Sequence, residues 1–414
     1  MTGAAARAIV RRAMLRLRGG RLVIVDGGRE LAFGPEDSDL HARVEVSDER
    51  AWSGLLRGST GWGEGFVDGH WSCDDLVALA RIACRNLAAL DRWRRRVHPV
   101  VGPVQRAVGL VPTNTRPGAR SNISAHYDLG NELFAAFLDG GMTYSCAYFS
   151  DPDASLERAQ MAKLERICRQ LRLGPEDHLL EIGTGWGSLA IHAATEHGCR
   201  VTTTTISREQ HVYARERVRD AGLADRVTVL LRDYRDLTGS YDKLVSVEMI
   251  EAVGWQYFET FFSTCSRLLH EDGLMALQAI VIGDDQYEAE KASRSFSNKH
   301  VFPGGCLPSQ RLITELIRSE TDMRVIWLDE ISAHYARTLE IWRQRFNDAW
   351  PELSRSGYDE RFRRLWNFYL ASSEAGFRER RIHDLQLLFA KPGWRVEGRA
   401  REAPAEAPQI ASSV

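Results

Sequence analysis

The segment 179–189, LLEIGTGWGSL, constrains the fold more than any other part of the chain. A short apolar run ends at Glu181, and Gly183, Gly185 and Gly187 follow at alternate positions. Glycine adopts backbone angles closed to residues with a Cβ atom, so the pattern predicts a strand running into a tight turn that a ligand can approach. It matches neither the dinucleotide-binding nor the triphosphate-binding glycine pattern. A glycine-rich turn in some other α/β protein is the alternative.

The composition favours a protein that stays in the cytoplasm. The 414 residues, 44% of them hydrophobic, are enough for two packed domains. The seven cysteines are scattered without a C-x-x-C pair, which argues against a zinc site and a disulfide framework, and we expect no metal ion. No apolar run approaches the roughly 20 residues that span a bilayer, and no signal peptide is recognisable. A net charge of −2 gives no general attraction to nucleic acid, so no nucleic-acid partner is expected.

The first 111 residues predict a smaller N-terminal α+β domain with a lipid-facing or membrane-associated role. Residues 4–17 mix apolar and arginine residues as a basic amphipathic helix, which could lie on an anionic lipid surface or pack on its own domain. Short strands are expected at 21–33 and 41–46, and helical patterns around 53–57 and 73–90. The basic cluster RWRRR at 92–96 suits a membrane interface, a phosphate-bearing surface or an exposed helix end.

The proline- and glycine-containing segment 112–121 predicts a linker, followed by a catalytic domain over 122–395 and a disordered tail over 396–414. Beyond the linker, helical and strand patterns alternate. They are expected at 155–171 (helix), 179–182 (strand), 200–206 (strand), 208–221 (helix), 227–231 and 241–247 (strands), 257–269 (helix) and 274–282 (strand). This alternation predicts an α/β fold with a doubly wound, mostly parallel sheet, whose ligand lies at the carboxyl ends of the strands.

Polar groups follow several of these strands. Ser207 could cap the next helix with Gln210 at the capping-box position, or Thr205 and Gln210 could face a ligand. Asp233 could accept a hydrogen bond from an adenine amine and Tyr234 could stack on the ring, although a surface loop would explain both.

Two carboxylates, Glu248 and Glu251, directly follow the strand at 241–247, which puts them at the mouth of the predicted sheet. Nearby in the sequence, the polar cluster at 124–128 and Tyr144-Ser145-Cys146 flank an apolar helix. None of these segments identifies an activity by composition or spacing alone.

Taken together, the segments AHYDLGN, MTYSCAYF, EIGTGWG, TISREQ, DYRDL, SVEMIEAVG, FPGGCLPS, HYARTLEIWRQRF and FYLASSEAGF occur in an order that resembles the cyclopropane-fatty-acyl-phospholipid synthase family. This family is a lipid branch of the S-adenosylmethionine-dependent methyltransferases and is related to the mycolic acid cyclopropane synthases. The resemblance covers residues 122–393 and implies a class I methyltransferase Rossmann-like sheet with helical lipid-binding additions. Residues 1–121 resemble, more weakly, the additional N-terminal domain of the synthases that act on phospholipids.

The resemblance also implies site residues. Those that would bind S-adenosylmethionine are Tyr144, Ser145, Glu181, Gly183, Gly185, Gly187, Thr205, Gln210, Asp233 and Tyr234. The family holds a bicarbonate ion as the base, and its ligands would correspond to Cys146, Glu251, Tyr335 and the backbone of Ile280. Two positions depart from the family pattern: Gln278 stands where a histidine is familiar, and Glu248 where many members carry glycine. Glutamine can still donate to an oxyanion, so the ion site is not excluded, but the two departures leave its tuning and the product open.

The implied reaction is methyl transfer from S-adenosylmethionine to the cis double bond of an unsaturated phospholipid acyl chain. Bicarbonate-assisted proton loss then gives a cyclopropane fatty acid, or alternatively a 10-methylene fatty acid that a partner reductase converts to a methyl branch. A small-molecule methyltransferase and a non-catalytic lipid carrier are the alternatives from other classes. The implied place is the inner face of the cell membrane, with peripheral attachment, and a homodimer stays open.

Overall fold

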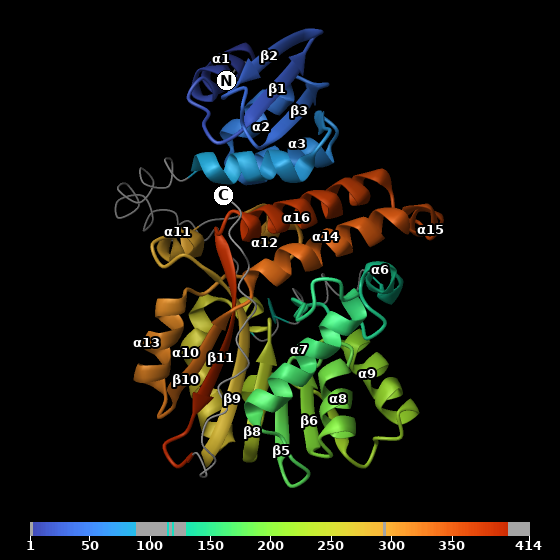
Figure 1. Cartoon of the computed structure of the whole chain (residues 1–414), viewed down its shortest axis with the longest axis vertical. Coiled ribbons are helices and arrows are strands. Elements are labelled where there is room, and N and C mark those ends of the chain that lie inside the picture. The colour runs from blue at the N-terminus through green and yellow to red at the C-terminus, as the bar shows by residue number, and fades with distance from the viewer. Residues whose placement is uncertain (1–2, 88–113, 116–117, 120–129, 293–294, 396–414) are drawn as a thin grey trace.

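The computed structural model describes residues 3–87, 114–115, 118–119, 130–292 and 295–395, whose strands form a four-stranded and a seven-stranded sheet (Figure 1). The basic cluster at 92–96, most of the linker at 112–121, the polar cluster at 124–128 and the tail at 396–414 lie outside the described residues. The predicted domain boundaries therefore stay predictions.

The N-terminal sheet has the strand order β2-β1-β3-β4. Its strands are β1 (Arg21–Asp26), β2 (Arg29–Phe33), β3 (His41–Val46) and β4 (Trp71–Cys73), and its helices are α1 (Gly3–Met14), α2 (Arg50–Leu56) and α3 (Gly58–Val67). Gly27 and Gly28, with φ of +58° and +77°, form the two-residue turn between β1 and β2, because this tight hairpin needs positive φ at both positions. The strands expected at 21–33 and 41–46 are thus confirmed. The helix expected from residue 73 begins at 76, because Cys73 pairs with Val44 in the sheet.

The predicted basic helix is α1, and its two apolar sides have different surroundings. Ala6 and Val10 are buried in the core of the N-terminal part, as expected for a helix that packs on its own domain. Ile9 of α1 is 50% exposed, and Leu15, directly after the helix, is 77% exposed. The helix therefore packs on its domain, while apolar side chains on it and next to it face outward.

The seven-stranded sheet has the order β10-β11-β9-β8-β5-β6-β7. Its strands are β5 (His178–Ile182), β6 (Arg200–Thr205), β7 (Val227–Leu231), β8 (Tyr241–Val247), β9 (Leu269–Ile282), β10 (Arg324–Glu330) and β11 (Ile382–Ala390). The strands from β5 to β9 run parallel, as predicted, whereas β11 lies antiparallel between β9 and β10. The last strand of the described chain is therefore an interior strand of the sheet.

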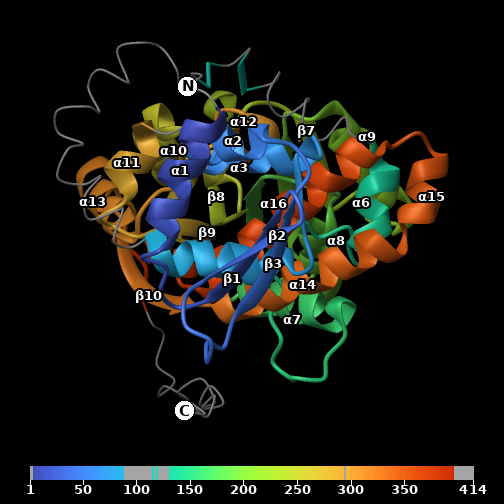
Figure 2. The same cartoon turned by 90° about the horizontal axis from the view of Figure 1, so that it is seen from above.

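Helices cover both faces of this sheet, which confirms the α/β prediction (Figures 1 and 2). The alternating elements are α6 (Asn131–Phe137), α7 (Leu156–Leu171), α8 (Ser188–Glu196), α9 (Arg208–Asp220), η1 (Tyr234–Asp236), η2 (Ile250–Ala252), η3 (Trp255–Tyr257), α10 (Phe258–Leu268), α11 (Tyr287–Ala292), α12 (Phe296–His300), α13 (Gln310–Glu320), α14 (Ser332–Asp348), α15 (Trp350–Arg355) and α16 (Glu360–Arg378). One apolar cluster joins α7 and α8 to the sheet, and another joins α10 and α13 to it. Of the helices described, none has both the length and the apolarity to cross a bilayer.

The N-terminal part rests on α16, and α14 lies between α16 and the large sheet (Figure 1). The ring of Trp62 meets that of Phe368 edge-on, with 5.5 Å between centroids. Glu379 accepts hydrogen bonds from Arg81 and Arg85 at 2.7 and 2.9 Å. One apolar core cluster contains residues of both parts, so the two sheets belong to one packed unit.

Candidate active site

The glycine turn lies where the sequence predicts it, between β5 and α8. Gly183, Gly185 and Gly187 have φ of +107°, +52° and +91°, which side chains with a Cβ rarely adopt. Gly183 and Gly185 line a pocket at the carboxyl end of the sheet, whereas Gly187 does not. A Cβ atom on Gly187 would come within 3.2 Å of the Cβ atom of Ala214, so this glycine allows α9 to pack closely.

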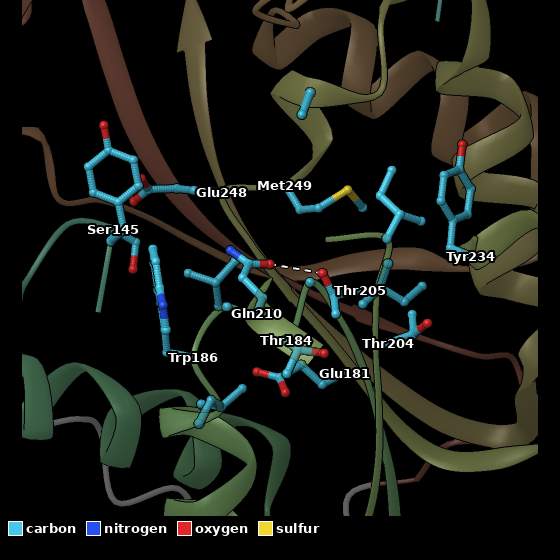
Figure 3. Close-up of a pocket in the computed structure, with 18 of the residues that line it drawn as sticks. Ser145, Glu181, Thr184, Trp186, Thr204, Thr205, Gln210, Tyr234, Glu248 and Met249 are labelled. Atoms are coloured by element: carbon cyan, nitrogen blue, oxygen red, sulfur yellow. Dashed lines mark hydrogen bonds between the residues drawn. The ribbon is translucent and has the colours of Figure 1, made fainter. Parts of the chain in front are cut away.

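The predicted cofactor residues surround this one pocket, Gly187 excepted (Figure 3). Those that line it are Tyr144, Ser145, Glu181, Gly183, Gly185, Thr205, Gln210, Asp233 and Tyr234. In Figure 3, Ser145 and Glu248 lie toward one side of the view and Tyr234 toward the other. The residues come together as a group, while their individual roles in binding stay predictions.

The segment after β6 both caps the next helix and contributes side chains to the pocket, the two roles considered for it from the sequence. The Ser207 hydroxyl accepts from the Gln210 backbone N–H at 3.2 Å, so Ser207 caps α9. The Gln210 side chain turns toward the pocket instead of completing a capping box, and its oxygen accepts from the Thr205 hydroxyl at 2.8 Å (Figure 3). A helix start and a polar pocket wall are thus built from the same residues.

Asp233 and Tyr234 border the pocket after β7. The Asp233 carboxylate accepts from the Arg235 guanidinium at 2.6 and 2.8 Å, and its side chain is 3% exposed. A carboxylate has several lone pairs, so this pairing leaves acceptor capacity for an amine. The Tyr234 ring packs edge-on against Phe261 with 5.6 Å between centroids.

Glu181 presents a buried carboxyl group to the pocket. It accepts from the Thr203 hydroxyl at 2.5 Å, and burial raises the pKa of Glu181 to about 8. A positively charged ligand beside this group would favour its ionised form.

A second polar group adjoins the pocket and is organised around Glu248. One of its carboxylate oxygens accepts from the Cys146 backbone N–H at 2.8 Å and from the Gln278 amide at 2.6 Å. The other accepts from the Tyr335 hydroxyl at 2.5 Å. The φ of Glu248 is +48°, a left-handed conformation that costs a residue with a Cβ atom about 1–2 kcal/mol. The surrounding structure holds this residue in a strained position.

Glu251 and the backbone of Ile280 are the two remaining predicted ligands of the ion, and they bind each other. Glu251 accepts from the Ile280 backbone N–H at 2.5 Å. Its other oxygen is buried and makes no hydrogen bond within the described part of the chain. Burial, and then the charge of Glu248, raise the pKa of Glu251 to about 8.

The structure thus gathers the residues that the resemblance assigns to bicarbonate, but their donors are engaged. Cys146, Gln278 and Tyr335 donate to Glu248, and Ile280 donates to Glu251. The arrangement as found does not fit a further anion, because no donor among these is left for it.

Two residues at this site were missed by the sequence analysis. Lys163 of α7 is fully buried, and its ammonium donates to the Ser145 hydroxyl at 2.6 Å. Asp384 of β11 accepts from the Gln278 amide at 3.0 Å. Burial lowers the pKa of Lys163, whereas burial and the charge of Glu248 raise that of Asp384. A lysine on the apolar stripe of a predicted helix, and an aspartate inside an apolar run, were the signals that could have revealed them.

The prediction of no metal ion was based on the spacing of the cysteines along the sequence. The fold nevertheless brings one cysteine close to two histidines, which could together bind a metal ion. Cys168, His192 and His197 offer ligand atoms within 4.8 Å of one another. Glu165 lies 3.1 and 3.0 Å from the two imidazoles. None of these four residues lines the pocket described above, and both imidazoles hydrogen-bond to Glu165.

Comparison with known proteins agrees with this geometry. The family model described as mycolic acid cyclopropane synthetase matches residues 114–387. The chain belongs to this family. Among similar family members, a tuberculostearic acid methyltransferase of Mycobacterium tuberculosis is 38% identical over 90% of this chain and 88% of its own. The cyclopropane-fatty-acyl-phospholipid synthase of Escherichia coli is 39% identical over 81% of this chain and 84% of its own.

Solved structures of the mycolic acid cyclopropane synthases share the catalytic fold. The cyclopropane synthase MmaA2 of Mycobacterium tuberculosis has a TM-score of 0.62 and 27% identity, and covers 68% of this chain and 99% of its own. A mycolic acid cyclopropane synthase complexed with SAH and CTAB has a TM-score of 0.62 and 28% identity, over 68% of this chain and all of its own. This chain is an S-adenosylmethionine-dependent methyltransferase of the cyclopropane synthase family with a class I methyltransferase fold.

Proposed function

We propose that this enzyme transfers a methyl group from S-adenosylmethionine to the cis double bond of an unsaturated phospholipid acyl chain and forms a cyclopropane fatty acid. The proposal is based on one observation: Glu248 lines the same pocket as Ser145 and the glycine turn. The predicted cofactor residues and the residues hydrogen-bonded to Glu248 are therefore neighbours. The similarity to a cyclopropane-fatty-acyl-phospholipid synthase supports the substrate class.

The residues at this junction suit a reaction through a carbon cation. Bound S-adenosylmethionine supplies an electrophilic methyl group. The aromatic side chains of Tyr144 and Trp186 line the same pocket as Glu248. Aromatic faces attract cations, so this wall stabilises positive charge without offering water as a nucleophile. A carboxylate in the same wall can remove the proton that must leave. The bicarbonate ion stays a prediction, and nothing in this scheme depends on it.

A methyl-branched product is the second candidate. It is favoured by the tuberculostearic acid methyltransferase, whose similarity extends over 90% of this chain. Methyl transfer would be the same, but a hydride shift before proton loss would give an exocyclic methylene group. A partner reductase would then be needed to make a methyl branch.

The test is to incubate the purified full-length chain with methyl-labelled S-adenosylmethionine and vesicles of monounsaturated phospholipid. Both products add one CH₂ to the acyl chain, so fragmentation after hydrogenation must locate it. A ring supports the first candidate and a methylene group the second. Cofactor turnover with small molecules only would indicate a small-molecule methyltransferase, and lipid binding without turnover would indicate a carrier.

We also propose that the enzyme reaches its substrate at the membrane surface through α1. Ile9, Arg11 and Arg12 are exposed on this helix, and Leu15 is exposed directly after it. Basic and apolar side chains on one exposed segment suit the surface of an anionic bilayer. The predicted location at the inner face of the cell membrane depends on this contact.

A further inference from the structure

The carboxylate of Glu248 has the hydrogen-bond environment expected of a bound anion. Its oxygens accept from three donors on separate elements: Cys146 before α7, Gln278 on β9 and Tyr335 on α14. Carboxylate and bicarbonate are both planar oxyanions that present two oxygens to donors, so one set of donors can serve either of them. Cys146 and Tyr335 are among the ligands that the resemblance assigns to the ion, and Gln278 stands at the position of the familiar histidine.

Counting protons shows why both anions cannot be held by these donors at once. The Cys146 amide and the Tyr335 hydroxyl each have one proton, and both donate to Glu248. The Gln278 amide has two, one for Glu248 and one for Asp384. The Ile280 amide proton is used by Glu251. Among the residues assigned to the ion, a protonated Glu251 would be the one donor left, so a second anion would displace Glu248 or have this single donor.

The charges around Glu248 also disfavour a second anion. The titratable groups that face Glu248 are Cys146, Lys163 of α7, Glu251 of η2, Tyr335 of α14 and Asp384 of β11. Lys163 is the one cation among these groups, against three carboxyl groups. Burial raises the pKa of all three carboxyl groups, so this buried site already disfavours negative charge, and a further negative ion would meet the same desolvation cost.

The backbone shows that Glu248 is held in place. It has a left-handed φ of +48° directly after β8, where glycine would be unstrained, and its N–H donates to the Gln278 carbonyl at 2.8 Å. The side chain is thereby directed into the pocket wall beside Ser145 (Figure 3).

We propose that Glu248 replaces bicarbonate as the base of this enzyme; this inference rests on the proposed function. The alkene π electrons form a carbon–carbon bond to the methyl group as its bond to sulfur breaks, which leaves a cation on the neighbouring carbon. A Glu248 oxygen then takes a proton from the lipid. The electrons of that C–H bond close the ring or, after a hydride shift, form the methylene double bond. The proton leaves Glu248 to water when the product departs.

The experiment compares the full-length wild type with Glu248→Gly and Glu248→Gln in the lipid assay, in bicarbonate-free buffer and with added sodium bicarbonate. The wild type should turn over equally in both. Glu248→Gln should lose about 10²–10⁴-fold in both, because the amide fills the site without acting as a base. Glu248→Gly should lose as much without bicarbonate and recover with it, because the donors become free. Binding of S-adenosylhomocysteine by each variant verifies that the pocket is folded.

Arg380→Gly is the matched control, because Arg380 also has a positive φ, at +53°, and does not line the pocket. It should leave turnover unchanged in both buffers. A wild type that requires bicarbonate, a fully active Glu248→Gln, or a Glu248→Gly that bicarbonate does not restore would each overturn the inference. A wild type that methylates no lipid in either buffer would instead contradict the proposed function.

Discussion

The hydroxyl of Tyr335 should act on proton removal and not on cofactor binding. It donates to Glu248 at 2.5 Å and does not line the pocket, so Tyr335→Phe removes one stabilising donor and keeps the ring that stacks on Phe377. We expect turnover to fall about 10–100-fold and the dissociation constant of S-adenosylhomocysteine to stay within about twofold. Calorimetry and turnover of the same sample measure both. Tyr241→Phe, remote from Glu248, is the control, and a matching loss of cofactor affinity in Tyr335→Phe would contradict the assignment.

The carboxyl group of Glu251 should make stability depend on pH. Folding raises the pKa of Glu251 from 4.5 to about 8, so the native state binds the proton more tightly than the unfolded chain. The stability this contributes is fully present below the unfolded value and is lost as pH rises through the folded value. We expect Glu251→Gln to lack this loss, so the free energy of unfolding of the variant should rise relative to that of the wild type by about 3–4 kcal/mol between pH 5 and pH 8.

Denaturant unfolding of both proteins at several pH values measures this difference. Glu315→Gln on the exposed side of α13 is the control. Parallel pH profiles of Glu251→Gln and the wild type would show that the carboxyl group is not perturbed as described.

At the residue scale, the sequence predicted the residues that line the pocket better than the buried charged residues beside it. The glycine turn, Thr205 and Gln210 follow strands, and strand ends meet at one sheet edge, so local patterns suffice to place them. Lys163 and Asp384 reach Ser145 and Gln278 from distant elements. Only long-range packing of α7 and β11 brings them there, and no short pattern encodes that packing.

At the element scale, α1 should bind anionic vesicles through both kinds of exposed side chain. We expect Arg11→Gln with Arg12→Gln to weaken binding by about 2 kcal/mol, or roughly 30-fold, and to reduce its salt dependence. Ile9→Ser with Leu15→Ser should weaken binding at low and high salt alike. These variants leave Ala6 and Val10 in the core, which a truncation would remove. Vesicle flotation measures binding.

The same charge change on α13, Arg311→Gln with Arg318→Gln, controls for net charge. Unchanged flotation of both α1 double variants at either salt concentration would exclude this helix as the membrane contact.

The elements themselves were predicted where apolar periodicity and turns agree. The bounds of β7 and β8 match the prediction, and α10 differs by one residue at each end. The strand expected from residue 274 starts earlier, as β9 at Leu269, because Leu269 pairs with Tyr241 of β8. The antiparallel place of β11 was not predicted, because strand order depends on how distant segments pack.

At the scale of the whole molecule, the two parts should unfold together. Phe368 of α16 is buried against Trp62 of the N-terminal part, within one shared apolar cluster. Truncating a buried phenylalanine to alanine costs about 3–5 kcal/mol. We expect calorimetry to show one transition for the wild type and two for Phe368→Ala. Phe261→Ala, which removes the same volume from the cluster around α10, should lower stability without separating the transitions.

The interior place of β11 also sets the order in which this enzyme can be made. While the chain is being synthesised, β9 and β10 have emerged but lack the strand that joins them, so both expose unpaired edges. Asp384 arrives with that late strand, and the helices that carry Tyr335 and Phe368 precede it by only a short length of chain. The surroundings of Glu248 are thus completed only when β11 enters the sheet, so the growing chain holds no finished proton-accepting site before β11 has emerged.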